Sequence, residues 1–383
     1  MNKISNNSTL FESYKLGDLT LRNRVVMAAM TRCRADPKDG VPTELHAEYY
    51  SQRASAGLIL TECSPISKNG QSFLGAGGIY TKEQIEGWKK VTKAVHVKGG
   101  LIFMQIWHAG RAAIPALIEE ENIGPSPIGI KGGLTRGVDH VVPREMTKDD
   151  IKKVIEDFRQ GAINAKEAGF DGLELHGANG YLVDNFLRTS ANQRKDEYGG
   201  SAENRSRFCL EVIDALISVF GAKRVGIKLS PVGRYQDMFD ENPLETYSYL
   251  LQQLDKKGIA FVELVEPDSP DSLVPIPKND FPAPEKQIPE VTKALSPYFK
   301  GTIIINNGLT PETAEKAINS GIAHLASFGK RFINNPDLVE RVQNGWKIKE
   351  TFDFATAFAN GPEGYIDFPF YSEKSAIFAS EGK

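Results

Sequence analysis

The sequence is poor in cysteine and has no disulfide or zinc pattern. Its 383 residues include three cysteines, Cys33, Cys63 and Cys209, and no two of them lie close together in the chain. A disulfide scaffold would need more cysteines, and a zinc module would need close pairs. We therefore expect a reducing compartment. The six histidines are scattered without metal-ligand spacing, so we expect no metal site.

Long apolar runs and an excess of one charge are also missing. The longest apolar runs, such as residues 101–104, fall far short of the ~20 residues that a membrane helix needs. The 46 basic and 49 acidic residues give a net charge of −3, which favours neither nucleic acid nor an anionic membrane as a partner. Residues 1–14 resemble no signal peptide, and residues 380–383 match no peroxisomal or prenylation signal. These absences predict a cytoplasmic protein.

Several familiar catalytic motifs do not occur. No G-x-G-x-x-G follows a predicted strand, and the sequence has no Walker P-loop, H-E-x-x-H or G-x-S-x-G. A Rossmann dehydrogenase, a nucleoside triphosphatase, a zincin and an α/β-hydrolase are therefore all disfavoured. With 40% hydrophobic and 25% charged residues, the composition is that of a globular protein with a large core.

The sequence does contain a regular alternation of short apolar runs with longer segments of helical period. The runs predict eight strands, at residues 25–29, 58–61, 101–106, 172–176, 224–229, 260–265, 302–306 and 324–327. No linker-like stretch interrupts the pattern, which favours one α/β domain, a (β/α)8 TIM barrel, over two doubly wound domains. We predict a single domain over residues 1–383, with the barrel at about 22–345 and a C-terminal extension at 346–383.

Turn and cap residues predict where several helices begin. The signals are Pro42 in a first turn, capping boxes at Thr81 with Gln84 and Thr147 with Asp150, Thr310 before Pro311, and Asn335 before Pro336. Between residues 151 and 165 apolar side chains recur at i, i+3 and i+4, which predicts a helix with one buried stripe.

Segments outside the alternation predict how the two ends of the barrel are finished. Residues 16–21 predict a small hairpin that plugs the bottom. Two long insertions, residues 113–145 and 266–289, follow strand ends, where barrel enzymes build their active sites. The two insertions either form a lid and the walls of a substrate pocket or are tolerated surface insertions. In the first case residues 232–240 would also shape the pocket.

Side chains suited to hold a substrate follow the fourth predicted strand, in the run His176-Gly-Ala-Asn179-Gly-Tyr181. An imidazole and a carboxamide three residues apart leave the barrel mouth together and can converge on one ligand oxygen. The Tyr181 phenol lies just beyond them and can deliver a proton. The structural alternative is a hydrogen-bonded core histidine beside a packed tyrosine.

Glycines and cations follow the last two predicted strands. Asn307 and Gly308 come after the seventh strand, and Gly329, Lys330 and Arg331 come after the eighth. Barrels commonly bind a phosphate at these two loops, and freed backbone N–H groups with nearby cations suit a phosphomonoester. We therefore predict a phosphorylated ligand.

Three further strand ends carry polar side chains. Lys228, on the fifth strand, is either a Schiff-base nucleophile or a charge partner for a cofactor. Thr31 and Gln105 offer neutral donors and acceptors, as a heteroaromatic ring with carbonyls needs. Trp107 is either a packed core residue or part of the same mouth. The residues alone therefore leave the identity of the bound ring open.

Two motifs together resemble one known family. The run H-G-A-N-G-Y and residues 196–208, Asp-Glu-Tyr-Gly-Gly-Ser-Ala-Glu-Asn-Arg-Ser-Arg-Phe, are similar to the classical branch of the old yellow enzymes, FMN-dependent ene-reductases. The resemblance extends from about residue 10 to residue 371. It implies tightly but non-covalently bound FMN, NADPH as the reductant, and a monomer or homodimer.

The resemblance also implies a role for each candidate residue. His176 and Asn179 would hold the carbonyl or nitro oxygen of an activated alkene whose β-carbon accepts hydride from reduced FMN, and Tyr181 would protonate the α-carbon. Trp107 and Tyr365 would line the substrate pocket. The residues implied to bind FMN are Ala29, Met30, Thr31, Cys63, Gln105, Lys228, Asn307, Gly308, Gly329, Lys330 and Arg331.

This chain departs from the family pattern at four of these positions. Lys228 and Lys330 stand where arginine is usual, which keeps the charge but loses the bidentate fork. Ala29 replaces the usual proline, and Cys63 stands where small residues face the flavin in relatives. We therefore expect FMN affinity or potential to differ from the family norm.

Other functions stay open beside alkene reduction. The same pocket would also suit nitro groups, nitrate esters or a prostaglandin-type endoperoxide. A Schiff-base aldolase would use Lys228, and a binding-only flavoprotein would turn over no substrate. The presence of Tyr181 favours net reduction over the isomerase branch of the family, which lacks this proton donor.

Overall fold

Eight parallel strands close into a barrel, as the alternation predicts. The computed structural model describes residues 8–131, 134–135, 138–267, 283, 287–351 and 353–371. Around the barrel the strand order is β3-β4-β5-β10-β11-β12-β13-β14. Their bounds are Val25–Met27, Leu58–Pro65, Ile102–Trp107, Gly172–Gly177, Val225–Leu229, Phe261–Val265, Thr302–Asn306 and Leu325–Phe328. The TIM-barrel prediction is confirmed, and each strand lies at its predicted position, with β4 extending beyond its predicted end.

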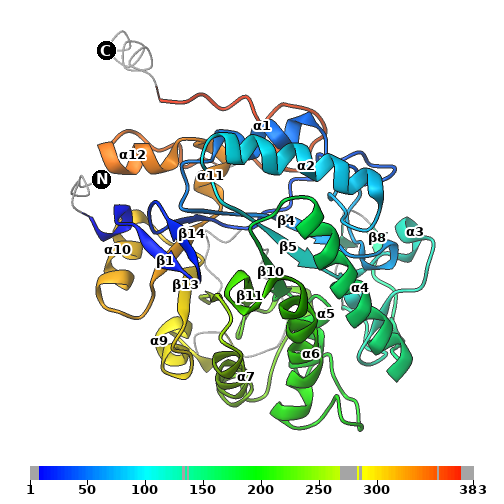
Figure 1. Cartoon of the computed structure of the whole chain (residues 1–383). Helices are drawn as coiled ribbons and strands as arrows, with labels where there is room; N and C mark the ends of the chain where they lie inside the picture. The colour runs from blue at the N-terminus through cyan, green and yellow to red at the C-terminus, as the bar shows by residue number, and fades with distance from the viewer. Residues whose placement is uncertain are drawn as a thin grey trace.

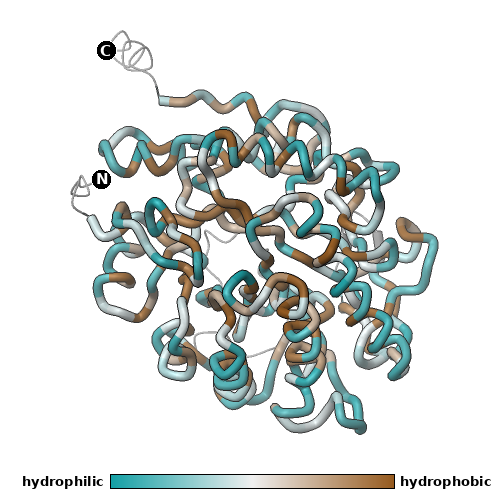
Figure 2. The backbone as a smooth tube through the Cα atoms, viewed as in Figure 1, coloured by the Kyte–Doolittle hydropathy of each residue, from teal (hydrophilic) through white to brown (hydrophobic). Residues whose placement is uncertain are grey.

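Helices surround this barrel on the outside (Figure 1). The longer ones are α1 (Glu44–Gln52), α2 (Lys82–Val97), α4 (Lys148–Glu167), α6 (Ala202–Phe220), α7 (Pro243–Lys257), α10 (Pro311–Asn319) and α12 (Leu338–Asn344). Shorter ones are α3 (Pro115–Ile118), α5 (Leu182–Leu187), α9 (Val291–Leu295), α11 (Lys330–Asn334) and α13 (Phe354–Ala357). Hydrophobic residues concentrate on the strands and on the inner helix faces (Figure 2). On α4 the buried stripe comprises Ile151, Val154, Phe158, Ala162 and Ala165, as predicted.

Side-chain caps begin several helices where the sequence places them. Thr81 with Gln84 and Thr147 with Asp150 form capping boxes at the starts of α2 and α4. Thr310 likewise caps α10. These caps satisfy backbone N–H groups that the first helical turn leaves without an intrahelical partner.

Two predicted helix starts are wrong by a few residues. Pro42 precedes the first turn of α1, because Thr43 takes the cap position and its backbone N–H donates to His46 Nδ1 at 3.2 Å. Asn335 does not cap α12, which begins at Leu338 after Asp337. The Asn335 amide instead donates to the carbonyls of Arg331 and Lys349, at 2.8 and 3.1 Å.

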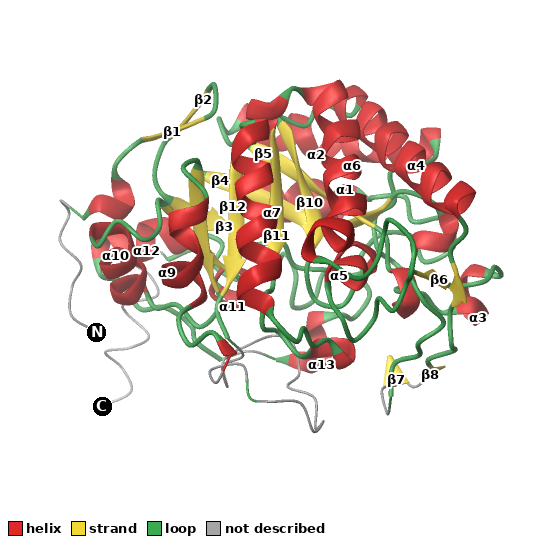
Figure 3. Ribbon diagram, turned by 90° about the horizontal axis from the view of Figure 1, so that it is seen from below, coloured by secondary structure: helices red, strands yellow, loops and turns green. Residues whose placement is uncertain are grey.

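A two-stranded hairpin closes one end of the barrel. Strands β1 (Tyr14–Leu16) and β2 (Leu19–Leu21) pair as predicted, and Leu16 and Leu21 are wholly buried against strand residues that include Phe103 and Phe261. Figure 3 shows this hairpin at the end of the barrel opposite α13. The carboxyl ends of the strands are therefore the end that remains for a binding site.

The first predicted insertion, 113–145, holds small elements of its own at the carboxyl end of the barrel. These are α3 and four two-residue strands, β6 (Ile123–Gly124), β7 (Leu134–Thr135), β8 (Val138–Asp139) and β9 (Arg144–Glu145), where β6 pairs with β9 and β7 with β8. Of the second predicted insertion, residues 268–282 and 284–286 lie outside the described residues. In the part of the chain that the structure describes, no helix is long and apolar enough to cross a membrane.

Candidate active site

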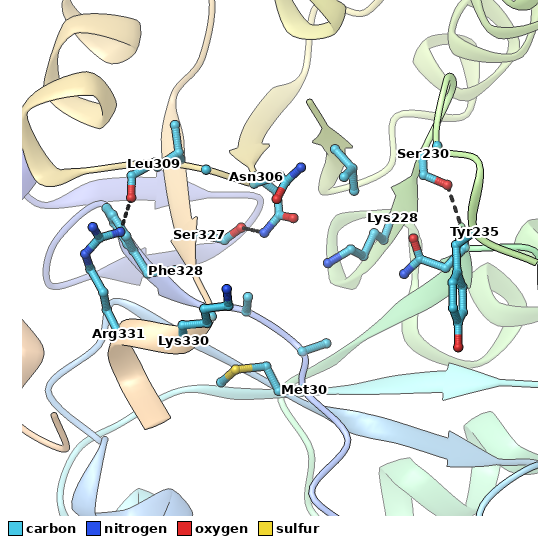
Figure 4. A pocket seen from close by; sticks show the side chains of 18 of the residues that line it. Met30, Lys228, Ser230, Tyr235, Asn306, Leu309, Ser327, Phe328, Lys330 and Arg331 are labelled. Carbon is cyan, nitrogen blue, oxygen red and sulfur yellow. Dashed lines mark hydrogen bonds between the residues drawn. The ribbon is translucent and has the colours of Figure 1, made fainter. Parts of the chain in front are cut away.

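A cavity of about 420 Å³ opens at the carboxyl ends of strands β3, β10, β11, β12, β13 and β14. This volume lies within the range of small-molecule sites. Figure 4 shows side chains from several of these strand ends around it, with Lys228 and Lys330 pointing into it. The predicted site residues that line it are Ala29, Met30, Asn179, Lys228, Asn307, Gly308, Gly329, Lys330 and Arg331. Thr31, Cys63, Gln105, His176, Tyr181, Trp107 and Tyr365 are not part of that lining.

His176, near the end of β10, and Asn179, in the turn after it, are held in defined positions. Asn179 has a left-handed backbone, with φ of 57°, and its N–H donates to Ser230 Oγ at 2.8 Å. The N–H of Ala178 donates to His176 Nδ1 at 3.3 Å, so the neutral ring carries its proton on Nε2. Both residues can therefore donate to a ligand oxygen, and we call the pair the oxygen clamp.

Tyr181 lies beside the clamp in an aromatic cluster. Its ring meets His176 edge to face at 4.8 Å between centroids and meets Trp107 at 5.1 Å in the same geometry. Phe73 stacks on Trp107 at 5.8 Å. The Trp107 indole N–H is buried and has no hydrogen-bond partner among the described residues. The cluster fixes the Tyr181 ring next to the imidazole.

The environment sets the protonation states of these groups. Burial, helped by the charge of Lys228, lowers the pKa of His176 to about 3, so the imidazole is neutral at physiological pH. Burial raises the pKa of Tyr181 well above its usual value. The phenol therefore keeps its proton until a strong base, such as a carbanion, takes it.

Thr31 and Cys63 meet at the ends of neighbouring strands. The Thr31 hydroxyl lies 2.9 Å from Cys63 Sγ, where either group can donate. Burial raises the pKa of the Cys63 thiol far above its usual value, so it stays a neutral packed group.

Gln105 and Lys228 each face a buried carboxylate inside the barrel. Gln105 Nε2 donates to Glu174 Oε1 at 2.7 Å. Lys228 Nζ lies 3.6 Å from Glu263 Oε1 and forms an ion pair with it. The two glutamates were not predicted as site residues, although a charged residue within an otherwise apolar strand is a visible signal in the sequence.

The end of the cavity that lies across from Lys228 carries the turn at Asn307 and Gly308 and the cations Lys330 and Arg331. Asn307 and Gly308 adopt φ of 83° and 65°, which turns the backbone after β13. Arg331 donates to the carbonyl of Leu309 and pairs with Glu350 at 3.1 Å, so it ties the loops after β13 and β14 together. Lys330 adds a second positive charge to the lining.

Tyr365 lies in a separate cluster beside α1. Its ring is wholly buried and stacks on Tyr49 at 4.0 Å between centroids. The guanidinium groups of Arg32 and Arg34 lie 5.2 and 4.9 Å from the centre of the same ring. The structure thus brings Tyr365 into an aromatic and arginine cluster on the α1 side of the barrel.

Tyr235 and Ser327 are among the cavity-lining residues that were not predicted from the sequence. Tyr235 comes from the loop after β11 and is half-buried. Ser327 accepts from Asn306 Nδ2 at 2.6 Å and itself donates to Glu263. Within the described ranges, no three His, Cys, Asp or Glu side chains are grouped to hold a metal ion. The fold and this set of donors fit a barrel enzyme whose mouth can hold an anionic small molecule.

Comparison with known proteins decides the class. A family model described as the NADH:flavin oxidoreductase / NADH oxidase family matches residues 9–349. A probable flavin mononucleotide-dependent alkene reductase of Leishmania infantum is 40% identical over 365 residues, 93% of this chain and 95% of that protein. The putative 12-oxophytodienoate reductase 2 of Oryza sativa subsp. japonica is 41% identical over 379 residues, 95% of this chain and 94% of that protein. The solved structure of the old yellow enzyme homologue from Zymomonas mobilis matches with a TM-score of 0.89 at 37% identity, over 95% of this chain and 100% of that one. The chain belongs to this family of FMN-dependent flavin oxidoreductases, the old yellow enzymes.

The residues of the mouth fit FMN. FMN joins a phosphate dianion to a flat ring with carbonyl and N–H edges, and the cavity offers Lys330 and Arg331 at one end and Lys228 across from them. The left-handed backbone at Gly308 lets a ligand approach the main chain without meeting a side chain. Inside the barrel, β10 separates the strands that carry Gln105 and Lys228, and both residues are buried.

Proposed function

We propose that this protein is an NADPH-dependent ene-reductase that reduces the activated C=C bond of α,β-unsaturated carbonyl or nitro compounds. One observation carries the proposal: the His176 imidazole contacts the Tyr181 ring, and Asn179, three residues after His176, lines a cavity that suits FMN. FMN bound there would supply hydride chemistry. The other parts of the reaction fall to side chains of this chain.

The oxygen clamp would polarise the substrate. A neutral His176 Nε2–H and the Asn179 carboxamide can both donate to the carbonyl or nitro oxygen, which draws electron density away from the β-carbon. Because both donors are uncharged, the clamp would strengthen as negative charge develops on the oxygen without binding an anion tightly beforehand.

Tyr181 would complete the reduction by giving its phenolic proton to the α-carbon. Its ring is 6% exposed and held between His176 and Trp107, so the hydroxyl has little freedom to move. A positioned phenol of raised pKa is a suitable general acid for a carbanion or enolate.

The geometry at Lys228 supports a cofactor role over a Schiff base. Its Nζ is paired with the Glu263 carboxylate at 3.6 Å and lines the cavity. An aldolase would need a free amine nucleophile there, and no separate observation favours one. The ammonium group instead suits the carbonyl edge of a bound ring.

The visible spectrum of the purified protein under anaerobic conditions tests the proposal. We expect a flavin band that bleaches on addition of NADPH and returns on addition of 2-cyclohexenone. A protein that stays colourless after incubation with FMN would overturn the proposal. Reduction rates with NADPH and NADH, measured side by side, decide the reductant, for which the support is the family resemblance alone.

A further inference from the structure

Two buried glutamates flank Lys228 inside the barrel. Glu174 lies on β10 and Glu263 on β12, the strands on either side of the β11 strand that carries Lys228. Both carboxyl groups belong to residues that are 0% exposed, and Lys228 is 6% exposed. Glu174 precedes His176 by two residues and so shares its face of the strand, one layer further into the barrel.

In each glutamate one carboxyl oxygen, Oε1, has polar partners and the other, Oε2, has none among the described residues. Glu174 Oε1 accepts from Gln105 at 2.7 Å, while Glu263 Oε1 accepts from Ser327 and faces Lys228 at 3.6 Å. Neither Oε2 atom has a donor among the described residues. A buried carboxylate oxygen without a donor is costly, whereas protonation of the carboxyl group removes its charge.

Charge balance indicates a proton on one of the two carboxyl groups. Two ionised carboxylates beside one ammonium would leave a net negative charge in a dry site, which is costly. The two buried acids therefore hold one proton between them. Burial and the neighbouring Glu263 raise the pKa of Glu174 well above its usual value. Among the groups around the two glutamates, Lys228 on β11 carries the positive charge. The other neighbours are neutral: Gln105 on β5, Ser327 on β14 and His176 on β10.

We propose that Glu174 and Glu263 form an acid–carboxylate pair that sets how much of the Lys228 charge reaches a ring bound in the mouth. They are positioning residues, since they act through Lys228, and the inference rests on FMN being the ligand. The single negative charge of the pair partly neutralises the ammonium and so weakens its pull on a negatively charged reduced ring. The shared proton keeps that charge at one.

Infrared spectroscopy of the full-length protein tests the shared proton. We expect a carboxylic acid C=O band at neutral pH that disappears in both Glu174→Gln and Glu263→Gln, because the glutamate left alone beside Lys228 ionises. Asp184→Asn is the matched control, since burial raises the pKa of that carboxyl too, and it should leave the band of the pair in place. A spectrum in which neither single glutamine variant loses a band would overturn the proposal.

The midpoint potential of bound FMN tests the effect on Lys228. Each single glutamine variant keeps one negative charge, so its potential should stay near that of the unaltered protein. The double variant Glu174→Gln with Glu263→Gln removes the charge, and we expect the ratio of reduced to oxidised FMN at a fixed potential to rise at least tenfold, or about 30 mV for a two-electron couple. A double variant that binds FMN at an unchanged potential would overturn the proposal.

The two tests separate this inference from the proposed function. A protein that binds no FMN refutes the function, but the infrared experiment still decides whether the pair shares a proton. A protein that binds and turns over FMN without a shared proton refutes the inference alone. If the double variant does not fold, the single variants still give a decisive infrared result.

Discussion

The substitution Tyr181→Phe isolates a single hydroxyl in the mouth of the barrel. The ring should stay where it is, because its contacts with His176 at 4.8 Å and Trp107 at 5.1 Å involve only the aromatic edges and faces. Because these ring contacts remain, removing the hydroxyl should change the free energy of unfolding by about 1 kcal/mol at most.

The effect on catalysis should be much larger and should fall on one half-reaction. A positioned general acid contributes roughly 10²–10⁴ in rate, or about 3–5 kcal/mol of barrier. Reoxidation of the enzyme by an enone needs that proton, whereas reduction by NADPH does not. We expect reoxidation to slow at least a hundredfold, within the range above, while the rate of flavin reduction is retained.

Anaerobic stopped-flow measurement of the two half-reactions gives both rates directly. Tyr14→Phe is the matched control, because its hydroxyl lies 2.9 Å from Thr302 Oγ1 in the hairpin that closes the other end of the barrel. This control should leave both rates unchanged. Equal slowing of the two half-reactions in Tyr181→Phe would remove Tyr181 from the proton-donor role.

Three further predictions concern the clamp, the hairpin and pH. Asn179→Ala removes one donor of the oxygen clamp and should raise the dissociation constant of a phenol about tenfold. The rate at which NADPH reduces the bound flavin should be retained. If a spectral titration gives an unchanged dissociation constant, the clamp is misassigned. Both Gly17 and Gly221 have positive φ, but a Cβ on Gly17 would lie 2.3 Å from the Lys223 carbonyl while one on Gly221 meets no described atom within 4 Å. Gly221→Ala should therefore cost about 1 kcal/mol in urea unfolding and Gly17→Ala distinctly more; equal costs would refute the contact. Burial lowers the pKa of His108 to about 3, so between pH 3 and pH 6.5 the unfolded chain binds a proton at His108 and the folded chain does not. The contribution of neutral His108 to the free energy of unfolding is therefore complete above pH 6.5. Below pH 6.5 this contribution falls by about 1.4 kcal/mol per pH unit. His108→Gln should show a shallower loss of stability between pH 6.5 and 5, and identical slopes would contradict the assignment.

Local patterns in the sequence determine the barrel and the place of its site. Strand positions follow from short apolar runs, because a parallel strand buried on both faces needs hydrophobic residues throughout. In a parallel barrel the residues at the carboxyl ends of the strands all lie at one end, so the sequence alone predicts that Asn179, Lys228, Asn307 and Lys330 lie at the mouth. Capping boxes such as Thr81 with Gln84 depend only on neighbours three residues apart, so they too were predictable.

Only the tertiary structure decides which side chains meet across the barrel. Glu174 and Glu263 come from strands on either side of β11, and their positions around Lys228 depend on strand register and barrel closure, which no local pattern determines. Tyr365 follows the last described helix, and its stacking on Tyr49 depends on how the C-terminal segment passes α1. Alternation along a strand determines which face a side chain occupies, but long-range packing determines its partner and, through burial, its charge.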